Sequence, residues 1–257
     1  MDDHTIDDKP PRYAIESDDE DEANPMQPSQ PSVPHEVTLV GNIPTGRCLV
    51  VASADPGIFW AKGAELGEQA GAVSVNGKEV GLVFNPSWTK ANVIISEAIW
   101  VLPVSAMHPY AQFTIDNLKP TSVALLDQYS VPNLITSDPV PATDAPIRTL
   151  STHSTSTHTP PNLVNTTSAS FLSILTISKI LSTLVLLPNP NTLKPAPPTM
   201  QPRSIIPTME WSSTATNEAQ QMMFQAISEP IDHPWQRKES VTTTVRRSEI
   251  GEGGMYI

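Results

Sequence analysis

The chain has 257 residues, of which 39% are hydrophobic, 5% aromatic and 16% charged. Its formal net charge of -12 argues against an electrostatic nucleic-acid binder, because such a protein needs a basic face. One cysteine, Cys48, excludes an intramolecular disulfide and a zinc site built on paired cysteines. The 27 prolines are about twice the usual share, which predicts a disordered part joined to a folded one.

Residues 1–34 are predicted to form a disordered, acidic and proline-rich tail. They carry ten acidic and two basic residues, a net -8 of the total -12. Charges of one sign repel each other, and the segment has too little apolar surface to offset the entropy of ordering. An acidic start is not typical of a secretory signal peptide. We therefore expect a protein of the cytoplasm, with the nucleus as a second compartment.

Residues 35–232 are predicted to form one α/β domain. Its first half contains β-rich runs at 36–40, 47–52, 79–84 and 91–96, then a helix within 103–118 and a strand at 121–126. These strands are continuously apolar and do not alternate with polar residues. This pattern predicts a central sheet that is covered by helices on both faces.

The second half of the domain contains two loops rich in proline, serine or threonine, predicted at 136–161 and 188–207. Between them the sequence predicts a buried helix at 166–181 and a strand at 183–187 that Pro188 ends. Thr166 or Thr167 is the predicted cap of that helix.

One apolar stretch within this half resembles a membrane span. It runs for 17 residues, from Phe171 to Leu187, and contains Lys179. A span needs about 20 residues with few or no charges, so we expect no membrane partner.

The last predicted helix covers 217–227 and is the clearest amphipathic one, with Asn217 as its predicted cap and Pro230 just beyond its end. Residues 233–257 are predicted to form a flexible tail, because they are polar and rich in glycine near the end.

Sequence motifs of catalysis and of cofactor binding are absent. No GxxxxGK[ST], GxSxG, HExxH or GxGxxG string occurs. We therefore expect no enzyme, no cofactor and no metal site. Cys48 and His108 could form a nucleophile pair, but Cys48 lies in an apolar run, where a free cysteine normally behaves as a small hydrophobe. An uncharacterised α/β enzyme stays an alternative.

Two short motifs lie within the acidic tail. Pro10, Pro11 and Tyr13 fit the PPxY ligand of WW domains, which bind preformed polyproline II. This motif supports a second alternative, an adaptor that is recruited by a WW domain. Ser17 is followed directly by Asp18, Asp19 and Glu20 and is a candidate phosphorylation site, where a phosphate would add further negative charge.

The last three residues, Met255, Tyr256 and Ile257, fit the hydrophobic–tyrosine–any pattern (HbYX) of proteins that dock on the proteasome core particle. A free chain end carries a carboxylate, which can accept a charge-assisted hydrogen bond from a lysine, worth about 1.5–3 kcal/mol. The tyrosine adds buried area and a polar tip. The residues before the motif form a flexible glycine tether, made of Gly251, Gly253 and Gly254.

Three features of the chain together resemble one family: the acidic run from Glu16 to Glu22, the α/β body, and the end from Glu249 to Ile257. The family is fungal proteasome assembly chaperone 1. The resemblance implies a heterodimer with proteasome assembly chaperone 2, in which each subunit has a sheet between helices. It also implies a cap on the 20S proteasome α-ring, with the HbYX tail in a pocket between two α-subunits, promoting ring assembly and blocking premature activator binding.

Overall fold

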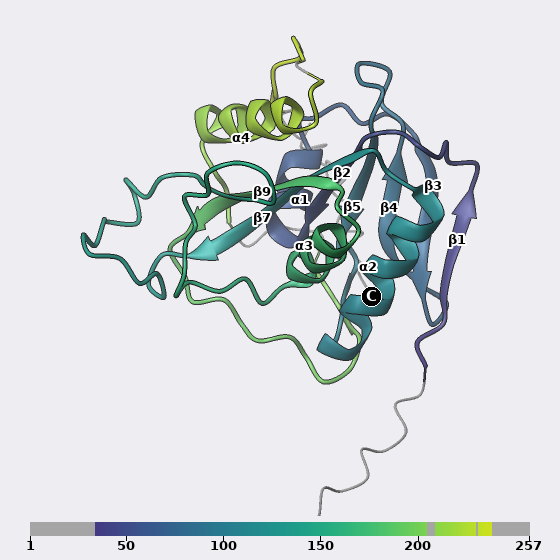
Figure 1. The fold of residues 1–257 in the computed structure, drawn as a ribbon, viewed down its shortest axis with the longest axis horizontal. Helices are drawn as coiled ribbons and strands as arrows, with labels where there is room; N and C mark the ends of the chain where they lie inside the picture. Colours follow the sequence, from purple (N-terminus) through teal and green to yellow (C-terminus); the bar gives the residue numbers. More distant parts are fainter. Residues whose placement is uncertain (1–33, 205–208, 230, 238–257) are drawn as a thin grey trace, which may run out of the picture. The chain divides into compact units, whose positions relative to one another are not determined.

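A mixed eight-stranded sheet forms the centre of the molecule (Figure 1). The computed structural model describes residues 34–204, 209–229 and 231–237. The strands of the sheet are β1 (Val37–Gly41), β2 (Leu49–Ser53), β3 (Gln69–Val75), β4 (Lys78–Phe84), β5 (Asn92–Ser96), β7 (Ser122–Ser130), β8 (Arg148–Ser151) and β9 (Leu181–Asn189). Their order across the sheet is β1-β3-β4-β5-β2-β7-β9-β8.

The middle of the sheet is parallel and its edges are antiparallel. β2 pairs in parallel with β5 on one side and with β7 on the other, and β7 pairs in parallel with β9. β1, β3 and β4 extend the sheet beyond β5 with antiparallel pairing, and β8 closes the other edge. Two further short strands, β6 (Trp100–Val101) and β10 (Gln201–Pro202), pair with each other.

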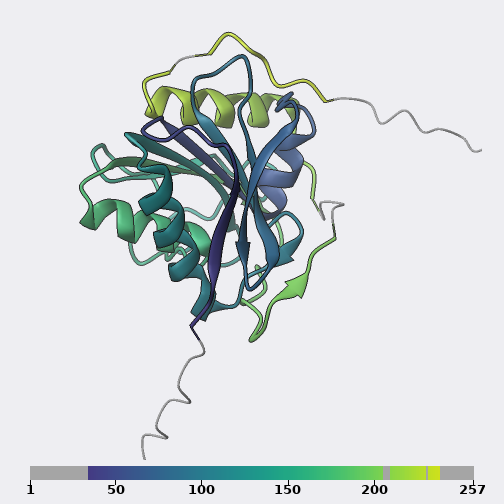
Figure 2. The same ribbon diagram turned by 90° about the vertical axis from the view of Figure 1, so that its right-hand side faces the viewer.

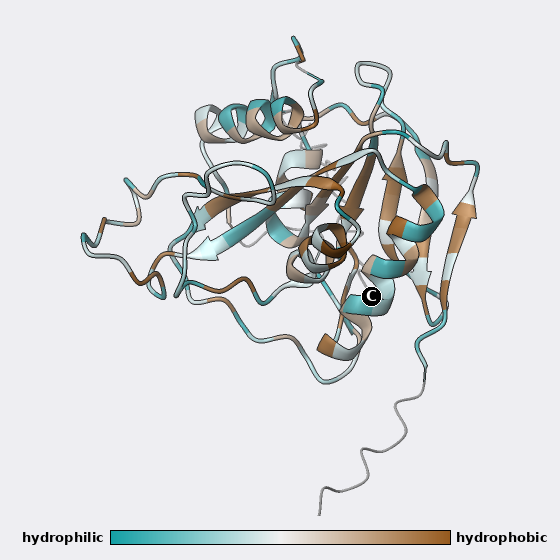
Figure 3. Ribbon diagram, viewed as in Figure 1, coloured by the Kyte–Doolittle hydropathy of each residue, from teal (hydrophilic) through white to brown (hydrophobic). Residues whose placement is uncertain are grey.

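Helices cover both faces of the sheet, as the apolar strands predicted. One face carries α2 (Val104–Leu118) and α3 (Thr167–Ile177), and the opposite face carries α1 (Ala54–Ala61) and α4 (Ser213–Ala226) (Figure 2). Every residue of β2 and β5 is buried. Figure 3 shows these central strands as hydrophobic. The predicted α/β class is therefore confirmed.

The sheet separates two hydrophobic cores. On the α2–α3 face, Tyr110 and Phe171 meet edge to face with ring centroids 5.9 Å apart. On the α1–α4 face, Trp60 and Phe224 are fully buried. Because aromatic side chains bury about 150–250 Å² each, these four residues contribute a large part of the packing that holds the helices to the sheet.

Both predicted loops contain short strands. β8 lies within 136–161, and β10 lies within 188–207. The prediction that Pro188 ends its strand is wrong, because β9 continues to Asn189. β8 reaches only as far as Leu186, so Pro188 lies at an open edge where its missing N–H costs no ladder bond. There the carbonyl of Pro188 accepts a hydrogen bond from Trp211 Nε1 at 2.8 Å.

The ends of two helices also differ from the prediction. α3 ends at Ile177, before Lys179, which adopts a left-handed φ of 56°. α4 begins earlier than predicted, because Ser212 and not Asn217 is its cap, with Ser212 Oγ accepting from Ala215 N at 3.1 Å. Asn217 lies inside the helix. Among the described residues, no helix is both long and apolar enough to cross a bilayer.

The described part of the predicted tail belongs to the folded domain. Trp235 is only 3% exposed and packs with the core on the α1–α4 face. The predicted boundary at residue 233 therefore lies too early, since the chain stays in contact with the body at least as far as Arg237.

Candidate functional site

The residues to which the sequence assigned a partner-binding role lie outside the described residues. These are the HbYX residues, the glycine tether, the WW ligand and the candidate phosphorylation site: Met255, Tyr256, Ile257, Gly251, Gly253, Gly254, Pro10, Pro11, Tyr13 and Ser17. Their roles stay predictions.

The structure does not bring Cys48 and His108 together. Cys48 is half-buried directly before β2, where its Sγ accepts from Ser122 Oγ at 3.3 Å and lies 3.8 Å from the carbonyl oxygen of Ile227. It packs with the core on the α1–α4 face. His108 is an exposed residue of α2, on the other side of the sheet. A nucleophile pair of these two residues is therefore not formed.

A cavity of about 530 Å³ lies at the carboxyl ends of the parallel strands, where open α/β sheets usually bind their ligands. Its wall contains three acidic side chains, each at or near the carboxyl end of a different strand. Asp55 comes just after β2, Glu97 just after β5, and Asp127 lies near the end of β7. Ala54 and Glu97 both have a φ of 54°, a conformation that such residues rarely adopt and that is found at functional sites.

Asp127 is fully enclosed and binds the first turn of α3. Its Oδ2 accepts hydrogen bonds from Thr166 Oγ1 and Ser168 Oγ, each at 2.6 Å, and its Oδ1 accepts from Gln128 N at 2.8 Å. Burial raises the pKa of this carboxyl above its ordinary value, although these hydrogen bonds and Arg203 act in the opposite direction. Thr166 precedes α3 as predicted, but its hydroxyl bonds to Asp127 and not to the helix backbone.

Glu97 makes a matching connection from the end of β5, which is separated from β7 by β2. Its Oε1 accepts from Leu102 N at 2.8 Å, and its Oε2 accepts from Thr167 Oγ1 at 2.7 Å. Burial raises the pKa of Glu97 as well. Three successive hydroxyl residues of the start of α3 thus bond to two buried carboxyl groups, which fixes the end of the helix to the sheet.

Asp55 and Arg203, which both line the cavity, form an ion pair. Arg203 Nη1 lies 2.9 Å from Asp55 Oδ1, and the side chains are 21% and 9% exposed. The backbone N–H of Arg203 also donates to the carbonyl of Ile99 at 2.7 Å, next to the pairing of β10 with β6. These two contacts fix Arg203 in the wall of the cavity.

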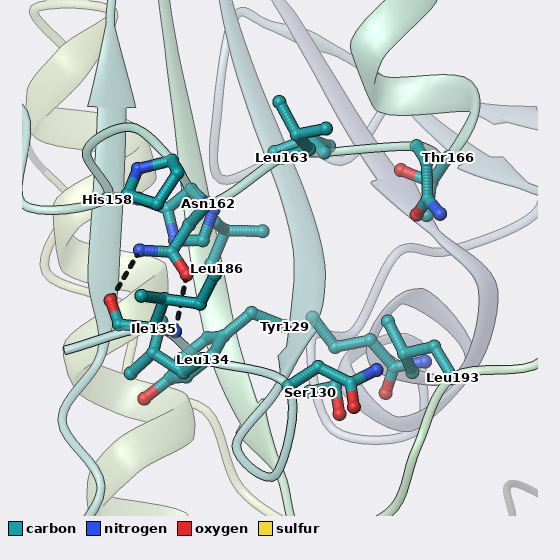
Figure 4. A pocket seen from close by; sticks show the side chains of 15 residues that line it. Tyr129, Ser130, Leu134, Ile135, His158, Asn162, Leu163, Thr166, Leu186 and Leu193 are labelled. Carbon is teal, nitrogen blue, oxygen red and sulfur yellow. Dashed lines mark hydrogen bonds between the residues drawn. The ribbon is translucent and has the colours of Figure 1, made fainter. Parts of the chain in front are cut away.

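A second, smaller cavity of about 270 Å³ lies beside β7 and shares four lining residues with the first, Gln128, Asn165, Thr166 and Leu193. The side-chain amide of Asn162 forms part of its wall by bonding to the backbone N and O of Ile135 at 2.8 and 2.9 Å (Figure 4). His158 also lines it and is buried. Burial and the nearby Arg148 lower the pKa of His158, which therefore lines the cavity as an uncharged ring.

Two acids in the wall of the large cavity, Asp127 and Glu97, hold the start of α3 against the sheet. The carboxyl oxygens of Asp127 and Glu97 are engaged by internal donors. In the part of the chain that the structure describes, no group of three or more His, Cys, Asp or Glu side chains is placed to hold a metal ion. Neither acid was predicted as a site residue from the sequence, although Glu97 and Asp127 each directly follow a predicted apolar strand.

The raised pKa values predict how stability depends on pH. Asp127 and Glu97, with ordinary pKa values of 3.8 and 4.5, hold a proton more tightly when folded than when unfolded. Their contribution to stability is thus complete below about pH 4 and is lost as the pH rises through the raised folded values. In urea unfolding, the stability of an Asp127→Asn/Glu97→Gln variant relative to the natural chain should rise from about pH 4 to 8. A relative stability that falls over this range would contradict the prediction.

By its fold the protein is a three-layer α/β/α domain. The central strands of its sheet are parallel, and a cavity lies at their carboxyl ends. Solved structures of this class include Pyrococcus furiosus PbaA, an archaeal homolog of proteasome-assembly chaperone. PbaA matches with a TM-score of 0.50 and 9% identity, over 76% of this chain and 88% of PbaA. At this identity the match shows a shared fold.

Two other solved structures are similar at a lower level. Pyrococcus furiosus PbaB, an archaeal proteasome activator, has a TM-score of 0.42 and 8% identity, covering 60% of this chain and 80% of PbaB. A protein of unknown function from Thermoplasma acidophilum has a TM-score of 0.41 and 8% identity, covering 58% of this chain and 69% of its own. No family model and no curated protein matches the sequence.

Proposed function

We propose that this chain is an assembly chaperone of the 20S proteasome. The observation that carries the proposal is the fold shared with PbaA, an archaeal homolog of proteasome-assembly chaperone, over 76% of the chain. The terminal Met255-Tyr256-Ile257 supports it by a separate observation, because that sequence fits the HbYX pattern. The chaperone works in the cytoplasm and nucleus and as a heterodimer with proteasome assembly chaperone 2.

In this proposal the domain and the tail bind the α-ring together. The domain offers a broad surface to the incomplete ring, and the HbYX residues enter a pocket between two α-subunits. One tail of three residues binds weakly by itself. Its connection to the domain raises its effective concentration, which can increase overall affinity by about 10²–10⁴. Occupied pockets exclude activators that use the same kind of chain end. No chemical step on a substrate is needed.

A pull-down with the full chain and with a chain that lacks Met255–Ile257 tests the proposal. The full chain should retain α-subunits and a second α/β chaperone. The shortened chain should retain much less of the α-subunits and the same amount of the second chaperone, because we place the heterodimer contact in the domain. A full chain that retains no α-subunit, or a shortened chain that retains all of them, would refute the proposal.

A further inference from the structure

The segment 231–237 follows α4 and packs on the domain, and Trp235 is its most deeply buried side chain. The ring of Trp235 stacks on Phe59, with centroids 5.2 Å apart and planes inclined by 28°. Its indole Nε1 donates to the carbonyl oxygen of Trp60 at 2.7 Å. With only 3% of its surface exposed, Trp235 fills a site on α1 as a core residue would.

Two amide side chains of α4 hold the backbone of the same segment. Asn217 Oδ1 accepts from Trp235 N at 2.7 Å, and Asn217 Nδ2 donates to Trp235 O at 3.2 Å. Gln220, which is 1% exposed, accepts from Trp60 Nε1 at 2.8 Å and donates to the carbonyl of His233. Asn217 thus uses both its donor and its acceptor on the segment, and Gln220 links the segment to α1, which fixes the direction of the chain as well as its position.

The surface of the domain is shaped to accept Trp235. A Cβ atom on Gly63 would lie 2.5 Å from Trp235 Cε2 and 2.5 Å from the carbonyl oxygen of Gln236, so that only glycine leaves room for the segment. Gln236 N donates to Gly63 O at 3.3 Å. Beyond it, Arg237 forms a two-pronged ion pair with Glu210, with N–O distances of 2.7 and 2.8 Å.

We infer that Trp235 is a positioning residue for the C-terminal tip, because it fixes the point on the domain from which the chain end extends. The inference rests on the proposed function of Met255–Ile257. The sequence predicts a flexible tail after Arg237, where 257 − 237 = 20 residues follow, and a coil of that length spans about 25 Å. If the whole segment 231–237 came loose, the chain would leave the domain at Glu229, whose Oε1 accepts from Lys90 N, with 257 − 229 = 28 residues beyond it. The volume of a coil grows with the 3/2 power of its length, so the local concentration of the tip would fall about twofold.

Limited trypsin digestion of the intact chain tests the anchor itself. The variants are Trp235→Ala, which removes the ring, and Gly63→Ala, which obstructs its site and leaves the ring in place. Trp100→Ala is the matched control, because Trp100 is partly buried with the core on the opposite face. Relative to cleavage after Arg246, cleavage after Arg237 should become more than about tenfold faster in both anchor variants and stay unchanged in the control. Equal rates in all four chains would overturn the inference.

Binding to isolated α-rings tests the positioning role. Trp235→Ala should weaken binding about twofold in the full chain and should have no effect in a chain that lacks Met255–Ile257. Equal weakening in both chains would mean that Trp235 acts through the domain surface, and would overturn the inference. If removal of the tip alone leaves ring binding unchanged, the proposed function is wrong, whereas the digestion result judges the anchor independently.

Discussion

Tyr256→Ala should weaken binding of the chain to the isolated α-ring by about 30- to 1,000-fold. Aromatic side chains that fill a pocket at the centre of an interface typically cost about 2–4 kcal/mol when they are truncated to alanine. The loss should be large here because the tip is the part of the tail that the pocket must enclose, and because weak tail binding is multiplied by its connection to the domain. Titration calorimetry with the purified ring measures the difference directly.

Two further variants separate the ring of the tyrosine from the free chain end. Tyr256→Phe keeps the apolar area and loses one hydroxyl, so it should cost no more than about 1.5 kcal/mol. Three glycines fused after Ile257 keep the tyrosine and move the carboxylate away, which should remove a charge-assisted hydrogen bond worth about 1.5–3 kcal/mol. Full binding by both the Tyr256→Ala chain and the extended chain would show that the chain end does not enter a pocket.

The elements that could be predicted are those with a clear hydrophobic pattern in their own residues. The runs that became β2 and β5 are wholly apolar, and a strand buried on both faces has this pattern. α1 was missed because Pro56 and Gly57 lie in its first turns and obscure the helical pattern. β3 was missed because it contains Gly71 and two irregularities in its pairing with β4, so that its apolar residues do not form one continuous run.

Contacts between distant segments could not be predicted from the sequence. Asn217 has the residue type and the place of a helix cap, and the polar residues after His233 have the composition of a tail. Only the folded chain shows that Asn217 lies within α4 and binds the backbone of Trp235. The buried acids are different, since a carboxyl residue directly after an apolar strand was visible at Glu97 and Asp127. What the sequence could not show is their common partner, the first turn of α3.

Trp60→Ala should lower the free energy of unfolding by about 3–5 kcal/mol, measured by urea denaturation. Trp60 is 0% exposed and fills the core between α1, α4 and the sheet. Its removal leaves a cavity and also deprives Gln220 Oε1 of the indole N–H. Because domains of this kind are stable by only about 5–15 kcal/mol, the change is a large part of the total.

Trp60→Phe distinguishes the two causes of this loss. Phenylalanine fills most of the space, so the cavity is smaller, while the acceptor of the buried Gln220 still loses its partner. An unpaired buried polar group costs about 1–3 kcal/mol, which is the loss expected for this variant. The amide of Gln220 also donates to the carbonyl of His233, so both variants should loosen the segment around Trp235 and expose Arg237 to trypsin. If Trp60→Ala changes stability by less than about 1 kcal/mol, α1 does not pack on the sheet in this way.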